Sequence, residues 1–444
     1  MKKKITIAGA GLVGSLSALY LTKRGYDVSV YEKRKDLRSE IITAGKSINL
    51  ALSTRGWTAL KKVNAEKEVE KIAIPMYKRI MHDINGNLTE QQYGKDGEAI
   101  YSVSRSELNV IMMNLAEKNG AKLHFNEQCV DVDFDNITAI FENNKTKNTS
   151  KVKSNAIIGA DGTYSAIRDV MVKKLNHEIE IKYIDHKYKE LLLPANNKGE
   201  HLLDKNALHI WPRGNFMLIA LANLDGSFTC TLFASEKGED SFESLNTEKK
   251  VTNYFAKVFP DFKSMIPDLY DQWKKNPTSS LSIVRTYPWN FNEKALLIGD
   301  AAHATVPFYG QGMNCGFEDC RILDEILNQN KDCLKSSFEE FSQVRKKDGD
   351  GVQDLSMHNF IVMRDKTADP KFLIQKKIEK KFSELYPEKW TPLYSMVSFT
   401  NISYSKAWKI GMEQELLMQK IMSIPNIENI WESEEIMSKM IDLI

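Results

Sequence analysis

Residues 9–14, GAGLVG, carry three glycines with the spacing of a dinucleotide-binding loop. A β-rich run from Lys4 to Ala8 precedes them, and apolar residues at helical spacing follow from Leu12 to Arg24. Glycines let the backbone approach a pyrophosphate, and a helix N-terminus offers free N–H groups and a positive dipole end. Glu32 ends the next β-rich run, near the roughly 20-residue spacing at which a carboxylate accepts hydrogen bonds from ribose hydroxyls. The pattern predicts a dinucleotide site but does not distinguish FAD from NAD.

Two further motifs favour FAD. Residues 159–168, GADGTYSAIR, match the DGxxSxxR pattern of flavoprotein hydroxylases. GDAAH at 299–303, with Pro307 and GQGMN at 310–314, resembles the GDAAH…P signature of the same class, in which the aspartate holds the ribityl chain. The helix that starts at these last glycines can direct its N-terminus at the flavin pyrimidine ring and stabilise negative charge on reduced flavin.

No residue stands out as an acid–base catalyst. His303 lies in a tight strand-to-helix turn, where a histidine is more often structural than catalytic. The sequence contains no HExxH or other metal-ligand spacing and no GxSxG nucleophile motif. We therefore assign no catalytic acid or base and expect no metal.

The hydrophobic pattern predicts the elements that position these motifs. The first three, Lys4–Ala8, Leu12–Arg24 and Tyr26–Glu32, form a βαβ unit. The others are a helix over Ser102–Asn119, strands from Leu123 to Phe141, a hairpin tip over Glu142–Ser154, strands at Ala156–Ala160, through most of Tyr183–Ser235 and at Ala295–Asp300, and helices from Gly316 onward, including one amphipathic helix over Met418–Ile444.

The predicted fold is α/β, with a Rossmann-like FAD-binding domain interleaved with an antiparallel-sheet substrate domain and followed by a C-terminal helical region. We assign residues 1–75, 100–182 and 285–330 to the FAD-binding domain, 76–99 and 183–284 to the substrate-binding sheet, and 331–444 to the helical region.

The composition limits the partners and the compartment. The 444 residues include 61 basic and 59 acidic side chains, and the net charge of +2 gives no reason to expect nucleic acid or an anionic membrane. Five cysteines without a CxxC pair argue against a disulfide framework or a zinc site. No signal-peptide pattern and no run of roughly 18 uncharged apolar residues is found. We expect a cytoplasmic protein.

Eight longer strings resemble the kynurenine 3-monooxygenase family of class A FAD-dependent aromatic hydroxylases. They are SINLALSTRG (47–56), IPMYKRIMH (74–82), YSVSR (101–105), LHIWPR (208–213), FTCTLF (228–233), PFYGQGMNCGFEDC (307–320), DLSMHNF (354–360) and PLYSMVSF (392–399). The resemblance runs from residue 5 to about residue 405. It implies the aromatic hydroxylase fold and hydroxylation of L-kynurenine to 3-hydroxy-L-kynurenine with NADPH and O2, through a flavin hydroperoxide.

The resemblance also implies site residues. Those matching the family's substrate contacts are Arg79, Tyr93, Asn359 and Tyr394 at the amino-acid end and Leu208, Met217, Leu221, Phe233, Pro307 and Phe308 around the aromatic ring. Those matching its FAD contacts are Gly9, Gly11, Gly14, Glu32, Ala51, Arg105, Asp161, Asp300, Gly312, Met313 and Asn314. A guanidinium fork suits a carboxylate, which is the chemistry expected of Arg79. Without the resemblance, the apolar residues would be interpreted as core. Tyr309 receives no role.

Two other functions stay open. A related flavin hydroxylase of another aromatic substrate would share the three flavin motifs, and so would a non-catalytic flavin-binding protein. Eukaryotic relatives carry a C-terminal membrane anchor, and this chain shows none, so we expect a soluble cytoplasmic enzyme without a membrane anchor. For the oligomeric state we expect a monomer or a homodimer.

Overall fold

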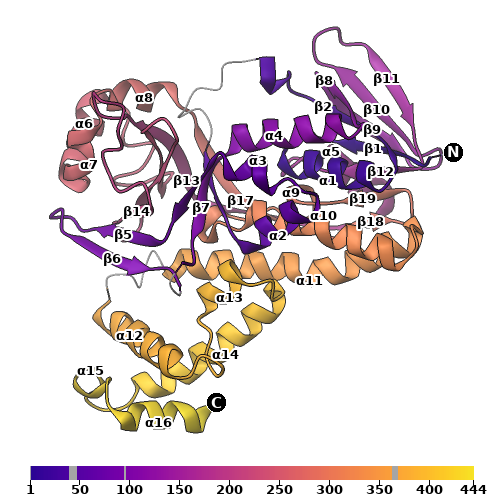
Figure 1. Cartoon of the computed structure of the whole chain (residues 1–444). Helices are drawn as coiled ribbons and strands as arrows, with labels where there is room; N and C mark the ends of the chain where they lie inside the picture. The colour runs from indigo at the N-terminus through magenta and orange to yellow at the C-terminus, as the bar shows by residue number, and fades with distance from the viewer. Residues whose placement is uncertain (1, 40–47, 95–96, 363–368) are drawn as a thin grey trace.

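A six-stranded sheet forms the centre of the N-terminal part of the computed structural model, which describes residues 2–39, 48–94, 97–362 and 369–444 (Figure 1). Its strands lie in the order β18 (Asn290–Phe291), β19 (Ala295–Leu297), β12 (Ala156–Gly159), β1 (Lys4–Ala8), β2 (Asp27–Glu32) and β8 (Lys122–Phe125). All neighbours are parallel except β18 and β19. Strand β12 is buried throughout, as expected for a parallel strand covered on both faces.

Helices and a small sheet cover this central sheet. Helix α1 (Leu12–Lys23) packs between α4 (Arg105–Lys118) and α10 (Gly312–Gln329). A second layer contains α5 (Ala166–Leu175) and the antiparallel strands β9 (Glu127–Asp133), β10 (Thr138–Asn143) and β11 (Thr149–Lys153). Tyr31 of β2 stacks on Phe141 of β10 and so joins the two sheets.

Three predicted elements differ from the structure. Residues 149–153 form strand β11 against β10, so the hairpin tip is shorter than the predicted Glu142–Ser154. The sequence TSKVK is polar and mostly exposed, and it therefore hides a solvent-facing edge strand. The helix predicted from Ser102 starts at Arg105, where Ser104 caps it by accepting from the Glu107 N–H. The predicted helix over Met418–Ile444 is interrupted after α14 (Tyr404–Met422), because Pro425 cannot continue a helix and Asn426 has φ +62°.

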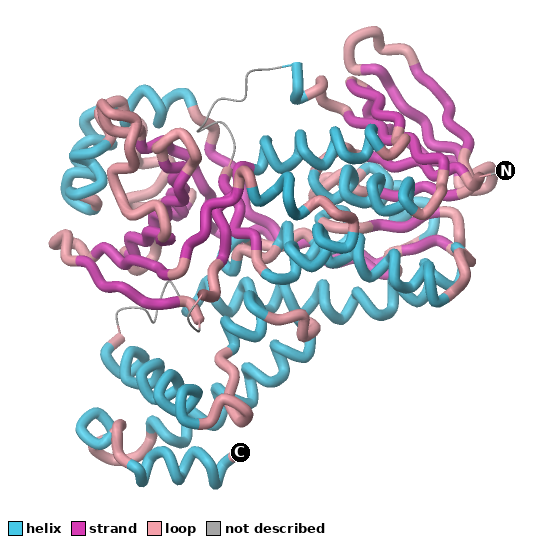
Figure 2. The backbone as a smooth tube through the Cα atoms, viewed as in Figure 1, coloured by secondary structure: helices cyan, strands magenta, loops and turns pink. Residues whose placement is uncertain are grey.

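A seven-stranded sheet forms the second lobe (Figure 2). Its order is β17 (Thr278–Tyr287), β13 (Glu178–Leu193), β16 (Phe228–Ser235), β15 (Met217–Ala222), β14 (Ala207–Pro212), β5 (Lys78–His82) and β6 (Leu88–Gln92). Only β14 and β5 are parallel. Helices α6 (Glu248–Val258), α7 (Pro260–Met265) and α8 (Leu269–Lys275) bury one face of this sheet in an aromatic cluster.

The two lobes are connected by a three-stranded sheet and by helices. Strands β3 (Asn49–Leu52), β7 (Ile100–Ser104) and β4 (Ala73–Met76) lie between them, with α2 (Thr54–Lys62), α3 (Glu66–Glu70) and the short helix η1 (Leu37–Ser39) nearby in the chain. The turn before α10 contains α9 (Asp300–His303) and the 3-10 helix η2 (Pro307–Tyr309).

The C-terminal part is helical. It consists of α11 (Leu334–Ile361), α12 (Pro370–Leu385), α13 (Leu393–Phe399), α14 (Tyr404–Met422), α15 (Ile427–Ile430) and α16 (Glu434–Leu443). Helices α12, α14 and α16 enclose a small hydrophobic core of their own. In the described ranges, none of the helices combines the length and apolar character needed to cross a bilayer. Two lobes with these sheets and a helical end confirm the predicted fold class, whereas the domain boundaries stay a prediction.

We expect Phe255→Ala to lower the free energy of unfolding by about 3–5 kcal/mol, the usual cost of removing a buried aromatic ring. Phe255 is fully buried under the seven-stranded sheet and contacts the rings of Phe259, Phe262 and Trp273. Urea unfolding followed by circular dichroism measures the change. Leu224→Ala is the control, because Leu224 is 57% exposed and its loss should change stability by less than about 0.5 kcal/mol. Equal effects of both variants would contradict this packing.

Candidate functional site

The glycine loop after β1 has a shape that larger residues cannot adopt. Gly9 has φ +99°, and an added Cβ would lie 2.4 Å from the carbonyl oxygen of Ala160. A Cβ at Gly14 would lie 2.0 Å from the Gly9 oxygen, so this glycine lets α1 pack against the loop. A Cβ at Gly11 would meet no atom within 4 Å. Two glycines are therefore required by internal packing, and the third leaves open space at the N-terminus of α1.

Hydrogen bonds hold Ala10 at the centre of this loop. Its N–H donates to Oε2 of Glu32 at 2.8 Å, and its carbonyl accepts from Asn109 Nδ2 at 3.1 Å and from the Ser15 hydroxyl at 3.1 Å. Burial opposes ionisation of Glu32, but hydrogen bonds from Arg34 and Ala10 outweigh it and hold the pKa of Glu32 below its ordinary value. A buried carboxylate thus lies beside the loop, at the end of β2.

Arg168 links the second flavin-type motif, residues 159–168, to the third, which begins at Gly299. Arg168 is 2% exposed, and its guanidinium donates to the carbonyls of Thr163 at 2.8 Å and Ala301 at 3.3 Å. Asp161 caps α5, since its Oδ2 accepts from the N–H of Ala166 at 2.7 Å. The buried Oδ1 of Asp161 has no hydrogen-bond partner among the described residues, and burial raises the pKa of this carboxyl.

The N-terminus of α10 is held against β3. Asn314 is fully buried, and its side chain accepts from the Ser53 N–H at 2.9 Å and donates to the carbonyls of Ala51 at 2.8 Å and Gly310 at 3.0 Å. The hydrogen bonds of its side-chain amide are therefore made to backbone groups of the protein. The first N–H groups of α10, from Gly312 onward, have no acceptor one turn earlier in their helix.

The other predicted cofactor residues surround the same region. Arg105 is exposed at the start of α4, one turn before Asn109, and Asp300 is exposed at the start of α9. Ala51 lies 3.3 Å from the position of a Cβ at Gly310. The Met313 side chain differs from the rest, because it packs into the main hydrophobic core.

These features fit FAD. Two helix N-termini, those of α1 and α10, present N–H groups without a side-chain cap among the described residues. Such ends suit a pyrophosphate and an anionic ring. The open space beside Gly11, the carboxylate of Glu32 and the exposed Asp300 supply the remaining contacts that a dinucleotide needs.

A cage of aromatic rings surrounds Arg79. The Cζ of its guanidinium lies 5.2 Å from the centre of the Tyr93 ring and 5.1 Å from that of Tyr394. Its buried Nε has no hydrogen-bond partner in the described part of the chain. The ring of Tyr309 stacks on Tyr394 with centroids 5.7 Å apart. The cage therefore offers a cation whose Nε is available to a ligand.

Burial determines the protonation state of the three phenols. It raises the pKa of Tyr93, Tyr309 and Tyr394 above the ordinary value for tyrosine, although the charge of Arg79 acts in the opposite direction. All three phenols are protonated at neutral pH and can donate hydrogen bonds.

A histidine pair holds the strand that carries Arg79. His82 lies on the opposite face of β5, with Nδ1 2.8 Å from Asp261 Oδ2 and Nε2 2.9 Å from His209 Nδ1. Burial lowers the pKa of His209 to about 4, so it is neutral at physiological pH. In the parallel pairing of β5 and β14, Arg79 lies opposite Leu208.

The predicted apolar residues form two adjoining clusters. Leu208 and Leu221 pack with Tyr93, Tyr394 and Ala51. Met217, Phe233 and Phe308 form the second cluster, and Ile219 packs against both. Pro307 is exposed at the start of η2, and Asn359 Nδ2 donates to the Phe308 carbonyl at 2.6 Å. The structure thus places all ten predicted substrate residues around one region between the second lobe, η2 and α13.

A buried ion network lies behind this region, and sequence reasoning missed it. Arg345 is 1% exposed and bonds to Glu318, Asp319 and Asp348 at 2.8–3.0 Å. Arg55 is fully buried and bonds to Glu318 at 3.0 Å. These charges come from three helices, α2, α10 and α11, that are distant in sequence.

The network reaches both the flavin-type motif and the C-terminal helices. Asp319 accepts from His303 at 2.6 Å and from the Gly299 N–H at 2.9 Å. Burial opposes ionisation of Asp319, but the charges of His303 and Arg345 outweigh it and lower the pKa of Asp319 to about 2. Arg55 donates to the carbonyls of Val397 and Ile402, and Asp348 accepts from the Ser405 N–H at 3.0 Å.

The side chains of His303, Cys315 and Asp319 come within 4.8 Å of one another, as metal ligands would. Because Asp319 already accepts from Arg345, His303 and a backbone N–H, ion pairing accounts for the cluster without a metal. The bond from His303 to Asp319 holds the turn that Asp300 begins.

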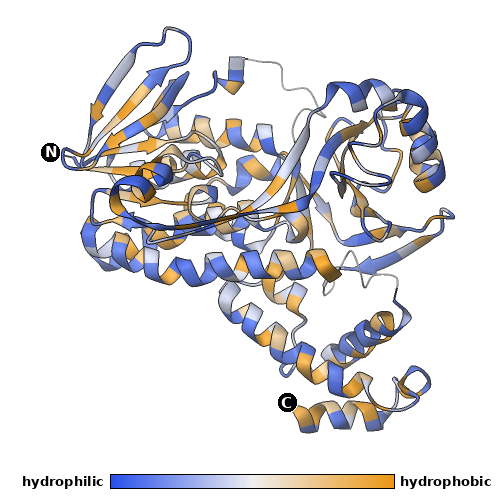
Figure 3. Ribbon diagram, turned by 180° about the vertical axis from the view of Figure 1, so that it is seen from behind, coloured by the Kyte–Doolittle hydropathy of each residue, from blue (hydrophilic) through white to orange (hydrophobic). Residues whose placement is uncertain are grey.

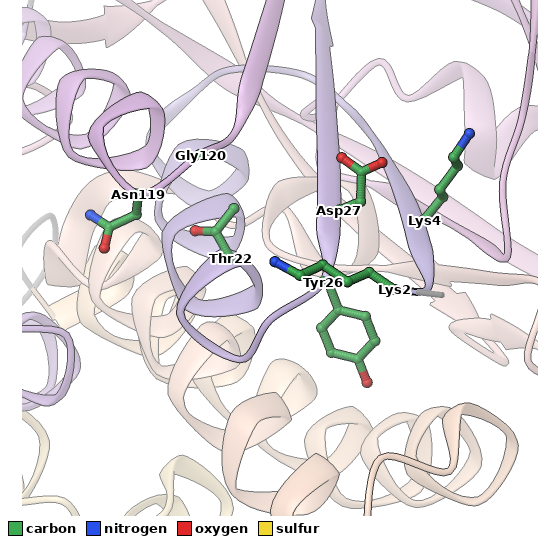
Figure 4. Close-up of a pocket in the computed structure, with 7 residues that line it drawn as sticks. All are labelled: Lys2, Lys4, Thr22, Tyr26, Asp27, Asn119 and Gly120. Carbon is green, nitrogen blue, oxygen red and sulfur yellow. The ribbon is translucent and has the colours of Figure 1, made fainter.

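A surface hollow elsewhere plays no part in this site (Figure 4). It is lined by Lys2, Lys4, Thr22, Tyr26, Asp27, Asn119 and Gly120. Lys4 and Asp27 are opposite each other in the strand register at the start of β1 and β2, whereas the glycine loop follows the other end of β1.

Comparison with known proteins gives a consistent result. The FAD binding domain family matches residues 2–331. A protein of Christiangramia forsetii named kynurenine 3-monooxygenase is 46% identical, over 100% of this chain and 99% of its own length. Proteins of the same name from Flavobacterium psychrophilum and Myxococcus xanthus are 48% and 42% identical over 100% and 97% of this chain, and 98% and 93% of their own lengths.

Solved structures share the fold at low identity. The tetrameric form of 2-methyl-3-hydroxypyridine-5-carboxylic acid oxygenase has a TM-score of 0.67 at 19% identity, covering 83% of this chain and 94% of that one. A variant of HpxO from Klebsiella pneumoniae, complexed with FAD, has a TM-score of 0.67 at 17% identity, covering 87% of this chain and 95% of that one.

We expect Arg345→Ala to destabilise the protein by about 3–5 kcal/mol, because it leaves three buried carboxylates without their shared cation. Thermal unfolding of the FAD-loaded protein measures the loss. The neighbouring Lys346→Ala is a matched control, since its pair with Asp350 is partly exposed and contributes about 0.3–0.5 kcal/mol. If the two variants melted alike, the network would not carry the stability assigned to it.

Proposed function

The chain belongs to the kynurenine 3-monooxygenase family, and from that membership we infer that it is an FAD-dependent monooxygenase that hydroxylates L-kynurenine to 3-hydroxy-L-kynurenine with NADPH and O2. The observation that carries the substrate assignment is Arg79. A half-buried guanidinium between two tyrosine rings, with its Nε unpaired among the described residues, suits an amino-acid carboxylate.

FAD is proposed to bind along the motifs described above. The glycine loop and the N-terminus of α1 would hold its pyrophosphate, Glu32 its adenosine ribose, Asp300 its ribityl chain, and the N-terminus of α10 its pyrimidine ring. Arg105, Ala51 and Met313 stay proposals as direct contacts. Asp161 and Asn314 are proposed to act by holding the surrounding loops, since their side chains bond to backbone. When bound, FAD supplies hydride acceptance from NADPH and activation of O2.

The protein's own contribution is to place the substrate and exclude water. Arg79 is proposed to bind the carboxylate, with Tyr93 and Tyr394 as neutral hydrogen-bond donors beside it. Asn359, which the family resemblance places at the amino-acid end of the substrate, donates to the Phe308 carbonyl and is therefore also proposed to hold η2 in place. The apolar residues would enclose the aromatic ring, where a dry site protects a reactive oxygen species from wasteful decay.

The substrate's own aniline nitrogen activates the ring position that is hydroxylated. The site accordingly needs no strong base, and the buried phenols around Arg79 are protonated.

We propose that the enzyme works in the cytoplasm, supported by its five free cysteines, four of them buried.

We expect the purified protein to be yellow with bound FAD and to oxidise NADPH faster when L-kynurenine is present. The assay follows NADPH absorbance and separates 3-hydroxykynurenine by chromatography. Bound FAD without stimulation by kynurenine would reject this substrate in favour of another aromatic compound. Flavin binding without any NADPH oxidation would leave a non-catalytic flavin protein.

We expect Arg79→Ala to weaken kynurenine binding by about 1.5–3 kcal/mol, the range for a hydrogen bond to a charged group. Titration monitored by flavin fluorescence gives the affinity. Arg79→Lys should recover only part of it, because an ammonium cannot make the two parallel bonds of a guanidinium. As a control, FAD content should stay unchanged in both variants. Wild-type affinity in Arg79→Ala would reject the carboxylate assignment.

A further inference from the structure

The N-terminal half of strand β13 has a free edge. Strand β16 pairs with β13 only from His186 onward, whereas β17 pairs with it from Glu178. Within the described residues, segment 178–184 therefore has a strand on one side only. An unprotected edge of this length is a template for another strand. Figure 3, the view from behind, shows the long strands of this sheet crossing that face of the molecule.

The same segment alternates as if one face were covered. Ile179, Ile181 and Tyr183 point to one face and are 37%, 43% and 57% exposed. Glu180 and Lys182 point to the other face. Glu180 lies opposite Arg285 of β17 in the strand pairing, but Arg285 bonds to Asp354, and within the described ranges neither Glu180 nor Lys182 forms an ion pair. A strand with β-branched and aromatic residues on one face normally buries that face, and this one does not.

The segment is complementary to itself. When two copies pair antiparallel about a two-fold axis at Ile181, Glu180 of each lies opposite Lys182 of the other, and Ile179 lies opposite Tyr183. Moving the axis to Glu180 or to Lys182 would place like charges directly opposite each other. Of these three registers, only the one centred on Ile181 matches both charge and apolar character.

We propose that the chain forms a homodimer through the edge of β13, with the two seven-stranded sheets joined into one continuous sheet. The interface is isologous, as two-fold symmetry requires. It is narrow, because seven residues a side bury less than a standard interface. The dimer is therefore in exchange with monomer at working concentrations.

Sedimentation velocity of the FAD-loaded protein over a concentration series tests this proposal. Glu180→Lys and Lys182→Glu should each raise the dimer dissociation constant by at least about tenfold, since each creates two like-charge pairs across the axis. The double variant Glu180→Lys/Lys182→Glu should restore it. A protein that stays monomeric throughout, a dimer indifferent to the single changes, or a double variant that fails to recover would each overturn the proposal.

Disulfide trapping gives an independent readout. In a Cys333→Ser background, which removes the exposed cysteine, Ile181→Cys should cross-link into a covalent dimer under mild oxidation. Lys182→Cys is the matched control, because it lies opposite Glu180 and should cross-link far less. Equal cross-linking of the two variants would reject the register.

Discussion

The architecture depends on one requirement, that the charges buried around Arg345 stay fully paired. Taking a guanidinium and three carboxylates out of water costs several kcal/mol for each ion, and only complete pairing offsets that cost. Here the pairing partners belong to separate helices. Glu318 and Asp319 lie on α10, Arg345 and Asp348 on α11, and Arg55 on α2. A small displacement of one helix leaves a charge of another unpaired.

This requirement links the flavin-type turn to the aromatic cage. Through His303 and Gly299, Asp319 fixes the turn that presents Asp300. Through the carbonyls of Val397 and Ile402, Arg55 fixes the segment that follows Tyr394. The flavin-type turn and the aromatic cage are therefore held in one frame, as hydroxylation at a single ring position demands. Two loosely connected parts could not keep a reacting atom within a fraction of an ångström of its target.

The residues of the flavin region could be predicted from the sequence itself, whereas those of the aromatic cage were predicted only through the family resemblance. Glycine spacing and strand patterns are local, and that was enough for the loop at Gly9–Gly14 and for the fold class. Arg79 and Tyr93 lie on one hairpin, β5–β6, but Tyr394 reaches them from about 300 residues further along the chain, and nothing in its local sequence predicts that contact. The ion network was invisible for a related reason, because charged residues on helices are usually solvent-facing. Asn314 illustrates the limit, since its partner Ala51 lies 263 residues away.

Tyr394 comes late in the chain, and that has a consequence for biosynthesis. Chains emerge from the ribosome N-terminus first, and early segments begin to fold before later ones exist. The glycine loop and Glu32 are available almost at once, whereas β19 must be synthesised before the central sheet is complete, and the ring that faces Tyr93 comes a further hundred or so residues later. A nascent chain can thus assemble a flavin-binding surface well before it can recognise a substrate. Selectivity for the substrate therefore arises only late in synthesis.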